Sequence, residues 1–274
     1  MRHLTCLVLV LLLAAVAPAG QEPLRFAVVG DAGTGGRPQF EIAQQMAAAR
    51  AASPFDFVLL LGDNMYGRQE PQDFVDKFER PYAALLGGGV RFFAALGNHD
   101  KPDNRLYAGF NMKGERYYTF ARGPVRFVIL DTNQLDPKQL GWADDTLARA
   151  TERWKVVSFH HPLYSNGGRH GSNVELRVVL EPLLVRHGVN VVFSGHEHIY
   201  ERLVPQKGIT YFVAGSGGQL RKGDLRRSAT TAAGFDEDRS FLLVEIAGDE
   251  MSFRAIARTG RTVDAGVIGR RPST

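Results

Sequence analysis

The sequence is short of cysteine, of long apolar runs and of any dominant charge. One cysteine, Cys6, stands in 274 residues, which excludes a disulfide framework and any zinc, haem or iron–sulfur site built on cysteine ligands. The apolar run at residues 7–17 falls short of the roughly 20 residues that a membrane-spanning helix needs. Lysine and arginine number 33 against 29 aspartates and glutamates, so the net charge is only +4 and does not indicate a dedicated nucleic-acid-binding protein.

The composition that remains is that of a globular protein. Hydrophobic residues make up 44% of the chain and charged residues 23%, which is too apolar for intrinsic disorder. A chain of this length can bury a sizeable core. It shows no internal repeat, low-complexity tract or linker, and we therefore expect one domain over residues 20–274.

The N-terminus has the features of a secretory signal peptide. Arg2 and His3 precede the apolar run, and a small-x-small sequence follows it at residues 17–19. These features are typical of a cleaved leader. We expect removal of residues 1–19, a secreted or periplasmic protein and no stable membrane anchor; an uncleaved N-terminal anchor is the alternative. Cys6 leaves with the leader, which excludes a disulfide-linked partner.

Short apolar runs alternate with helical patterns along the chain. Apolar runs that end at glycine or polar residues predict strands, whereas segments rich in good helix formers predict helices. The predicted strands cover residues 24–29, 57–61, 91–96, 117–120, 125–130, 154–159, 189–193, 209–214, 241–246 and 251–256, the fourth and fifth forming a hairpin. The predicted helices cover residues 39–51, 71–86, 137–150 and 173–187. This alternation indicates an α/β protein.

Several predicted strands end in glycine followed by a polar residue that can bind a metal ion. These pairs are Gly30-Asp31, Gly62-Asp63, Gly97-Asn98 and Gly195-His196. Ligand sites in α/β sheets gather at the carboxyl ends of the strands, where glycine allows tight turns and close backbone approach. A single pair of this kind also makes an ordinary turn, but the repetition indicates one shared site.

The polar side chains near these strand ends are carboxylates, a carboxamide and imidazoles. They are Asp31, Asp63, Asn98, His160, His161, His196 and His198. A donor set of this kind, without thiolate, suits iron, manganese or zinc. It is too large for one ion and fits two ions that share a bridging carboxylate. Paired ions suit phosphate ester chemistry because they clamp the attacking and leaving oxygens together.

Five sequence blocks resemble the signature of the calcineurin-like metallophosphoesterases. The blocks are Gly30-Asp31-Ala32-Gly33, Gly62-Asp63-Asn64-Met65-Tyr66, Gly97-Asn98-His99-Asp100, His160-His161-Pro162 and Gly195-His196-Glu197-His198. Their order and approximate spacing also match the family. The resemblance implies a four-layer α-β-β-α sandwich of two mixed β-sheets, with the metal ions at one edge on the strand-end loops.

Tyr66 narrows this resemblance to the purple acid phosphatases, and residues 60–66 are similar to their tartrate-resistant type. In that family the phenolate of the corresponding tyrosine binds ferric iron, because a hard trivalent ion favours an anionic oxygen ligand. The alternative is that Tyr66 only packs beside the site. The resemblance implies Fe(III) on Asp31, Tyr66 and His198, a bridging Asp63, and divalent iron, manganese or zinc on Asn98, His160 and His196.

The adjacent histidines His160 and His161 leave two assignments open. The family places its metal ligand two residues before the proline, which selects His160 as the ligand. His161 would then stand at the rim of the site. In the reverse assignment His161 binds the metal ion.

The resemblance also implies three catalytic residues. His99 matches a histidine that contacts the substrate phosphate, and Asp100 would orient its imidazole. His170, within the glycine-rich residues 165–171, matches a histidine that helps protonate the leaving group in the tartrate-resistant relatives. The alternative for His170 is a solvent-exposed loop histidine, and Arg169 is a further candidate for binding phosphate.

These residues predict an acid phosphatase that acts on small phosphate monoesters through a hydroxide held by two metal ions. A cationic histidine as proton donor favours activity below neutral pH. One alternative is a phosphodiesterase or nuclease with the same two ions, which the basic loop at residues 221–227 favours; that loop is otherwise a solvated surface loop. A metal- or phosphate-binding protein without turnover is disfavoured, since such a protein needs neither His99 nor His170.

Overall fold

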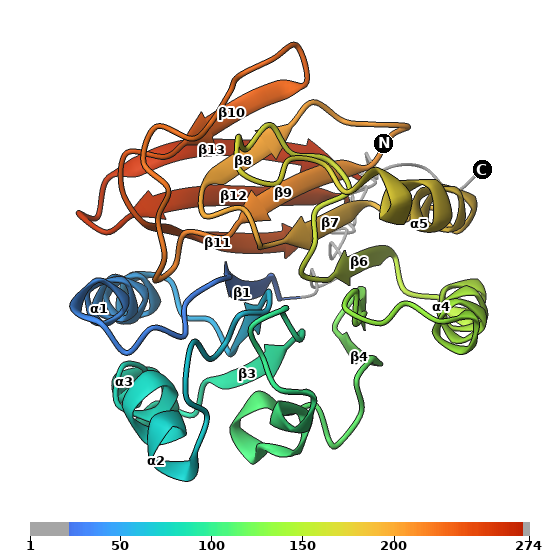
Figure 1. Cartoon of the computed structure of the whole chain (residues 1–274). Helices are drawn as coiled ribbons and strands as arrows, with labels where there is room; N and C mark the ends of the chain where they lie inside the picture. The colour runs from blue at the N-terminus through green and yellow to red at the C-terminus, as the bar shows by residue number, and fades with distance from the viewer. Residues whose placement is uncertain (1–21, 271–274) are drawn as a thin grey trace, which may run out of the picture.

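The computed structural model describes residues 22–270 (Figure 1). The predicted signal peptide, residues 1–19, therefore lies outside the described residues. Among the helices of residues 22–270, none is both long and apolar enough to cross a membrane.

The first β-sheet joins strands from both ends of the described chain. It contains β1 (Leu24–Val29), β2 (Phe57–Leu60), β3 (Arg91–Ala94), β11 (Ser240–Ala247), β12 (Glu250–Ala257) and β13 (Thr262–Gly269). The strand order is β13-β12-β11-β1-β2-β3. Strands β1, β2 and β3 are parallel, whereas β11 pairs with β1 and β12 in antiparallel fashion. The sheet is therefore mixed, with its parallel half built from the N-terminal strands.

The second sheet is built from the middle of the chain. It contains β4 (Tyr118–Arg122), β5 (Val125–Ile129), β6 (Trp154–Ser158), β7 (Val191–Ser194), β8 (Tyr200–Leu203), β9 (Thr210–Ala214) and β10 (Thr231–Phe235). The strand order is β10-β8-β9-β7-β6-β5-β4. Its centre, β5-β6-β7-β9, is parallel, and both edges are antiparallel.

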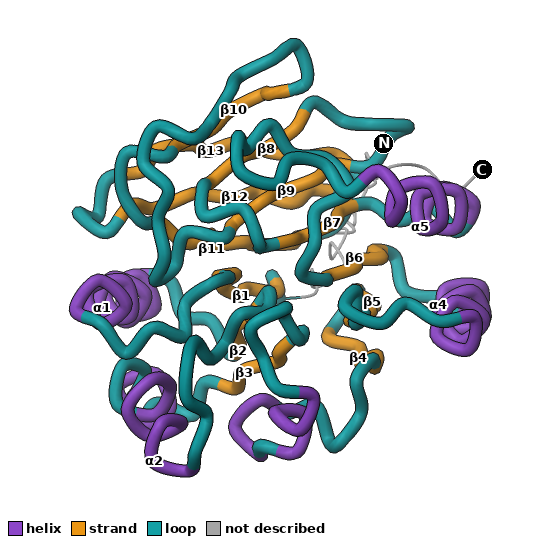
Figure 2. The backbone as a smooth tube through the Cα atoms, in the orientation of Figure 1, coloured by secondary structure: helices purple, strands orange, loops and turns teal. Residues whose placement is uncertain are grey.

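Helices flank the two sheets, as Figures 1 and 2 show. They are α1 (Arg37–Ala52), α2 (Pro71–Phe74), α3 (Ala83–Gly87), α4 (Pro137–Arg149) and α5 (Val174–Arg186). Short turns of other helix types cover Val75–Glu79 (π), Pro102–Leu106 and Ala108–Phe110 (both 3₁₀).

Three buried apolar clusters hold the layers together. The first lies between the sheets, where Phe26 stacks on Phe57 with a centroid separation of 5.1 Å and meets Phe127 edge-on at 5.4 Å. The second lies between the first sheet and α1 and α3, and the third between the second sheet and α4 and α5. Burying apolar surface on both faces of each sheet is what stabilises such layers. The structure confirms the expected α-β-β-α sandwich.

The predicted helix over residues 71–86 is interrupted in the structure. A π-helical turn over Val75–Glu79 follows α2, and α3 begins only at Ala83. Pro81 explains the break, because proline has no N–H to donate to the carbonyl four residues earlier. That carbonyl, on Lys77, instead accepts a hydrogen bond of 2.6 Å from the side chain of Gln39.

The other predicted elements are present with their ends shifted by at most two residues, including the β4–β5 hairpin. Three strands were not predicted: β8, β10 and β13. In β13 the exposed and half-buried positions alternate along the outer edge of the first sheet, and two of its residues are glycines, Gly266 and Gly269. Such a strand lacks the continuous apolar run that marks the central strands.

Main-chain contacts join the carboxyl ends of strands from both sheets. The amide of Gly30, after β1, donates to the carbonyl of Ala214 at the end of β9 with a length of 2.8 Å. The amide of Gly195, after β7, donates to the carbonyl of His160, after β6, at 3.0 Å. The first bond places strand-end loops of the two sheets against one another, and the second joins two loops of the second sheet. The predicted site residues lie in these loops.

Candidate metal centre

Three of the predicted ligands sit on strained backbone. Asp31, Asp63 and His196 have φ angles of 54°, 52° and 69°, in the left-handed region that residues other than glycine seldom adopt. Each follows the glycine that ends its strand. Strain of this kind persists where the surrounding structure fixes it, and it clusters at functional sites.

Glycine lets other backbone segments approach the two buried carboxylates. A Cβ atom on Gly97 would lie 2.2 Å from Oδ1 of Asp63, and one on Gly195 would lie 2.5 Å from Oδ2 of Asp31. No side chain fits at such distances. Glycine at these two positions is therefore required because the carboxylates pack against it, and not only because the turns are tight.

The first donor group combines two carboxylates, a phenol and an imidazole. Nε2 of His198 lies 3.3 Å from Oδ1 of Asp31. The hydroxyl of Tyr66 lies 3.3 Å from the same oxygen, 3.3 Å from Nε2 of His198 and 2.9 Å from Oδ2 of Asp63. Asp31, Asp63 and His198 thus present one ligand atom each within 4.8 Å of one another.

The second donor group is centred on His160, which is fully buried. Its Nδ1 donates to the carbonyl of Leu61 at 2.9 Å, which fixes the ring and leaves Nε2 as the potential ligand atom. This Nε2 lies 3.2 Å from Nδ1 of His196 and 3.0 Å from Oδ1 of Asn98. It also lies 3.5 Å from Oδ1 of Asp63, so Asp63 stands between the two groups.

The electrostatics of both groups favour a bound cation. Burial, together with the charge of Asp63, raises the pKa of Asp31 well above its ordinary value. Burial and the neighbouring imidazoles lower the pKa of His196 to about 2, and burial lowers that of His198 to about 4. Neutral imidazoles with exposed lone pairs, packed against close carboxylates, are the donors that a metal ion needs. The residues present therefore fit the paired metal ions that the sequence predicts.

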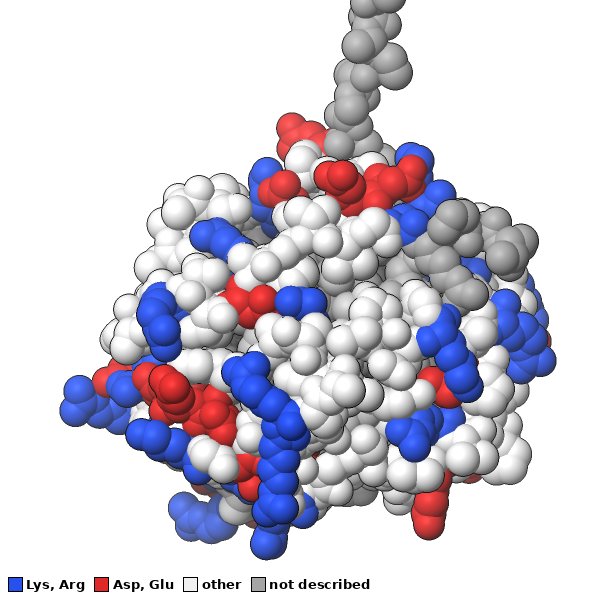
Figure 3. Space-filling model, turned by 90° about the horizontal axis from the view of Figure 1, so that it is seen from above, with Lys and Arg blue, Asp and Glu red and all other residues white. Residues whose placement is uncertain are grey.

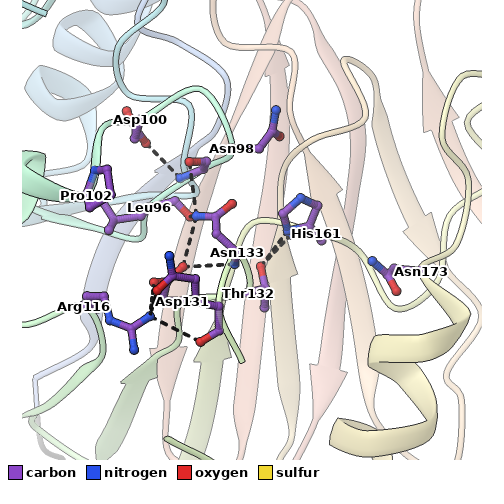
Figure 4. Close-up of a pocket in the computed structure, with 12 residues that line it drawn as sticks. Leu96, Asn98, Asp100, Pro102, Arg116, Asp131, Thr132, Asn133, His161 and Asn173 are labelled. Carbon is purple, nitrogen blue, oxygen red and sulfur yellow. Dashed lines mark hydrogen bonds and ion pairs between the residues drawn. The ribbon is translucent and has the colours of Figure 1, made fainter. Parts of the chain in front are cut away.

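His161 offers a ligand atom close to those of His160 and His196 and also lines a cavity of about 430 Å³ (Figure 4). Its ring centroid is 4.5 Å from that of His196, and its Nδ1 is 2.9 Å from the hydroxyl of Thr132. The structure thus brings both His160 and His161 next to His196. Because Nδ1 of His161 is engaged by Thr132, any metal contact of this ring would use Nε2.

His99 projects from the loop after β3 and is 52% exposed at its side chain. Its main-chain N–H donates to Oδ1 of Asp63 at 2.8 Å, and its ring packs 4.8 Å from that of Tyr66. The ring of His99 is therefore at the surface of the site, beside the first donor group. From there it can reach a molecule bound to the metal ions.

The carboxylate of Asp100 bonds other groups than the ring of His99, which the sequence expectation had paired with it. This carboxylate accepts hydrogen bonds from the main chain of Gly97, Asn64 and Met65 and from the side chains of Asn64 and Asn104. Within residues 22–270 the His99 ring is not among its donors. Converging main-chain N–H groups stabilise a carboxylate more directly than one distant imidazole. Asp100 therefore fastens the loop after β3 to the turn after β2.

His170 stands at the other side of the second donor group. Its ring centroid lies 4.2 Å from that of His196, and both residues line a second cavity of about 520 Å³. His170 is exposed, as is Arg169, which lines the same cavity. The predicted proton donor is thus next to the site and open to solvent.

Glu197, which has no role assigned from the sequence, is fully buried and stands between two predicted ligands in the chain. Oε1 of Glu197 accepts hydrogen bonds from the amides of His170 and Gly171 at 2.6 and 2.5 Å. The one sequence signal for this role is the position of the glutamate between His196 and His198. A carboxylate that is buried beside metal ligands needs a hydrogen-bond or charge partner.

Within the basic loop at residues 221–227, Arg221 packs beside the site, whereas Lys222, Arg226 and Arg227 are exposed, as expected of a surface loop. Arg221 lies 3.7 Å from Oε2 of Glu197, and Arg227 donates to the carbonyl of Gly234. Basic and acidic side chains are also interspersed over the face of the molecule in Figure 3.

Comparison with known proteins agrees with this geometry. Residues 24–200 match the family described as calcineurin-like phosphoesterase. The chain is 28% identical to tartrate-resistant acid phosphatase type 5 of Rattus norvegicus, over 98% of this chain and 97% of the relative.

Two solved structures share the fold at low sequence identity. One is GAP50, described as the anchor in the inner membrane complex of Plasmodium, with a TM-score of 0.78 at 19% identity over 91% of this chain and 90% of that chain. The other is purple acid phosphatase PPD1 from yellow lupin seeds, with a TM-score of 0.75 at 18% identity over 93% of this chain and 55% of that chain. The family match and the acid phosphatase relatives carry the functional conclusion: the chain belongs to the calcineurin-like phosphoesterase family, resembles its purple and tartrate-resistant acid phosphatases, and is a metal-dependent hydrolase of phosphoric esters.

Proposed function

We propose that the chain is a secreted or periplasmic acid phosphatase that hydrolyses small phosphate monoesters at a centre of two metal ions. The observation that carries this proposal is the position of Asp63 between two donor groups. Its Oδ2 lies 2.9 Å from the hydroxyl of Tyr66, and its Oδ1 lies 3.5 Å from Nε2 of His160. One carboxylate that reaches both groups suits a bridge between two ions.

The donor chemistry of the two groups supports different ions. Asp31, Tyr66 and His198 would hold the first ion, Fe(III), because two anionic oxygen donors suit a hard trivalent cation. Asn98, His160 and His196 would hold the second, a divalent iron, manganese or zinc ion, and Asp63 would bridge the pair. When bound, such ions supply Lewis-acid activation of phosphate and of water.

The chain's own residues would position the substrate and move its proton. The side chains of Asn98 and His99 are exposed at the mouth of the site, where both can contact phosphate oxygens. His170, exposed beside His196, would donate a proton to the leaving-group oxygen. A protonated imidazole is needed for that step, which favours activity below neutral pH.

Asp100 and His161 take supporting places in this proposal. Asp100 ties the loop that carries Asn98 and His99 to the turn that carries Asp63 and Tyr66. His161, on the wall of the 430 Å³ cavity, would face the substrate next to the second ion.

The experiment that tests the proposal compares a monoester with a diester. The full-length chain is expressed with export, and the purified protein is assayed with 4-nitrophenyl phosphate and bis(4-nitrophenyl) phosphate across a range of pH. Faster hydrolysis of the monoester, with an optimum below pH 7, is expected. Preference for the diester would replace the proposal with the phosphodiesterase alternative. A maximum well above pH 8 would contradict the ferric centre.

A further inference from the structure

The loop that carries His170 is fastened by three carboxylates from other parts of the chain. This loop, residues 165–172, lies within the connection between β6 and α5. Glu197 accepts from the amides of His170 and Gly171, Glu201 from the amide of Asn166, and Asp224 from the amide of Arg169. The loop is also bridged to the basic loop at Gly167 and Leu225. Its position is therefore set by side chains outside it.

Glu197 is the one of these carboxylates that bonds the backbone of His170 itself. Successive amides can converge on one anion when the chain turns through a left-handed residue, and Gly171 has a φ of +69°. A Cβ on Gly167 would lie 2.5 Å from Cδ of Glu197, so the loop backbone rests directly on this side chain. Hydrogen bonds from N–H groups to a buried carboxylate are among the stronger ones in proteins.

The second oxygen of Glu197 faces Arg221. Oε2 of Glu197 and Nη1 of Arg221 are buried, 3.7 Å apart, and neither makes a hydrogen bond among the described residues. Arg221 in turn is tied to the metal-binding turn, because its amide donates to the carbonyl of His198 at 3.0 Å. A cation at this distance balances a carboxylate that would otherwise be unpaired in the interior.

Glu197 also belongs to the turn that supplies two predicted metal ligands. The amide of His196 donates to Oδ2 of Asp31 at 2.9 Å, which locks this turn to the first donor group. Because Glu197 lies between His196 and His198 in the chain, a shift of its backbone would also shift these two predicted ligands. Any group that Glu197 holds is therefore placed at a set distance from the metal centre.

We propose that Glu197 is a positioning residue that sets His170 over the metal centre, with Arg221 holding Glu197 in place. The inference rests on the proposed function, because it gives Glu197 the task of placing the proton donor. It also assigns a role to the basic loop: Arg221 supports the active site instead of binding an anionic polymer.

Glu201 provides a matched control within the same loop. It is also a fully buried glutamate, and it accepts hydrogen bonds from the amide and side chain of Asn166 at 2.8 and 2.7 Å. It makes no contact with His170 among the bonds of the described residues. A substitution at Glu201 therefore reports what a general loosening of the loop does.

The test measures kcat for 4-nitrophenyl phosphate, which has a good leaving group, and for glycerol 2-phosphate, which has a poor one. The variants are His170→Ala, Glu197→Ala, Glu197→Gln, Glu201→Gln and the double variant of His170→Ala with Glu197→Ala. The full-length protein is used, and bound metal is quantified for each variant. We expect His170→Ala to lower kcat for the alkyl ester about 100-fold, the scale of general acid catalysis, with a smaller effect on the aryl ester.

Glu197→Ala should reproduce this selectivity at about tenfold or more, and the double variant should be no slower than His170→Ala alone. Glu197→Gln should lie between Glu197→Ala and the unsubstituted protein, because its amide oxygen can still accept both N–H bonds while its nitrogen faces Arg221. Glu201→Gln should slow both esters equally. If His170→Ala is selective for the alkyl ester and Glu197→Ala is not, or if the two effects multiply in the double variant, the proposal is overturned.

A crystal structure of Glu197→Ala separates this inference from the proposed function. The expected result is a His170 ring that has left its 4.2 Å contact with His196. A ring still in that place would overturn the positioning role. If the ring moves but His170→Ala slows both esters equally, the positioning role stands and the proton-donor role of His170 fails.

Discussion

The hydroxyl of Tyr66 lies 2.9 Å from Oδ2 of Asp63, three residues before it in the chain. Asp63 has a left-handed backbone conformation. The amide of Tyr66 donates to the carbonyl of Gly33, two residues after Asp31. Burial and the charges of Asp31 and Asp63 raise the pKa of Tyr66 above its ordinary value, so a cation between these oxygens is what would allow phenolate to form. The first donor group is thus built to bind a strongly charged ion.

Replacing Tyr66 by phenylalanine tests the ferric assignment. The iron-loaded protein should absorb visible light through charge transfer from phenolate to Fe(III), and Tyr66→Phe should lose this band while Asp31, Asp63 and His198 retain iron. The absorption spectrum, recorded with iron content, is the measurement. An unchanged band in the variant, or a colourless and fully active parent protein, would remove Fe(III) from this position.

The exposed ring of His99 predicts a loss of catalysis without a loss of metal. The main-chain N–H of His99 donates to Asp63, and His99→Ala keeps this bond. The ring Nε2 lies 4.0 Å from Oδ2 of Asp63, which is beyond hydrogen-bond distance, so its removal should leave the carboxylate in place. Removing a donor that stabilises the transition state costs about 100-fold in kcat. We expect that loss with unchanged metal content.

His187→Ala is the control for His99→Ala, because His187, at the end of α5, is paired with Asp144 on α4. It should keep full activity. Loss of metal in His99→Ala would show that the ring supports the centre structurally, and an unchanged kcat would exclude it from the reaction.

A substitution at Gly33 tests how tightly the turn of Asp31 packs against the turn of Asp63. A Cβ at this position would lie 1.8 Å from the carbonyl oxygen of Asn64. Gly33→Ala should therefore push the turn of Asp31 away from that of Asp63, weaken metal retention and lower the free energy of unfolding by about 1–3 kcal/mol.

Gly87→Ala is the matched substitution, because a Cβ on Gly87 meets nothing within 4 Å. Gly87 is the last residue of α3 and alanine is the better helix former, so the free energy of unfolding should equal the parent value or rise by up to about 1 kcal/mol. Denaturant unfolding and metal analysis of both variants are the measurements. Equal stability of the two variants would contradict the packing described here.

The ion pairs of Arg258, which lie far from the metal centre, should make a pH-dependent contribution to the stability of the fold. It bonds Glu41 on α1 at 2.6 Å and Asp238 before β11 at 2.9 Å, joining the helix to the first sheet. Hydrogen bonds from Arg258 and Arg37 lower the pKa of Glu41 from 4.5. A lowered pKa in the fold means that this stabilisation is complete above pH 4.5 and is lost as pH falls through the folded-state pKa.

Arg258→Ala should therefore lower Tm at pH 7, and the difference from the parent should shrink at pH 3. Thermal unfolding with a chelator present, which removes the effect of metal loss in acid, measures this. Arg149→Ala removes a solvent-exposed pair with Asp145 and should leave Tm unchanged at both pH values. A difference for Arg258→Ala that is constant with pH would contradict the ion-pair role.

The sequence predicts the central strands and the donor set because both depend on local pattern. Buried strands such as β1 and β2 are continuous apolar runs, and the glycine that ends each one marks the turn before Asp31 or Asp63. The helix predicted over residues 71–86 was wrong at Pro81, where the freed carbonyl of Lys77 finds its partner in Gln39, 38 residues away. Contacts of that range cannot be seen from local pattern.

The same limit applies to the acids around the site. Asp100 follows His99 directly, yet its carboxylate turns to the amides of Asn64 and Met65 on another loop. Glu197 looked incidental in sequence because its partners, the amides of His170 and Gly171, lie in a distant segment. The ligand types could be predicted, whereas the roles of carboxylates that fasten loops emerge only from the packed structure.

Metal depletion tests the central claim most directly. The protein is stripped with a chelator, retitrated with iron and a divalent ion, and assayed with 4-nitrophenyl phosphate beside Asp63→Ala, which lacks the carboxylate between the donor groups. Activity should vanish on depletion, return in proportion to metal up to two ions per chain, and be absent with little bound metal in Asp63→Ala. Full activity in the metal-free protein, or recovery at one ion per chain, would contradict a two-metal phosphatase.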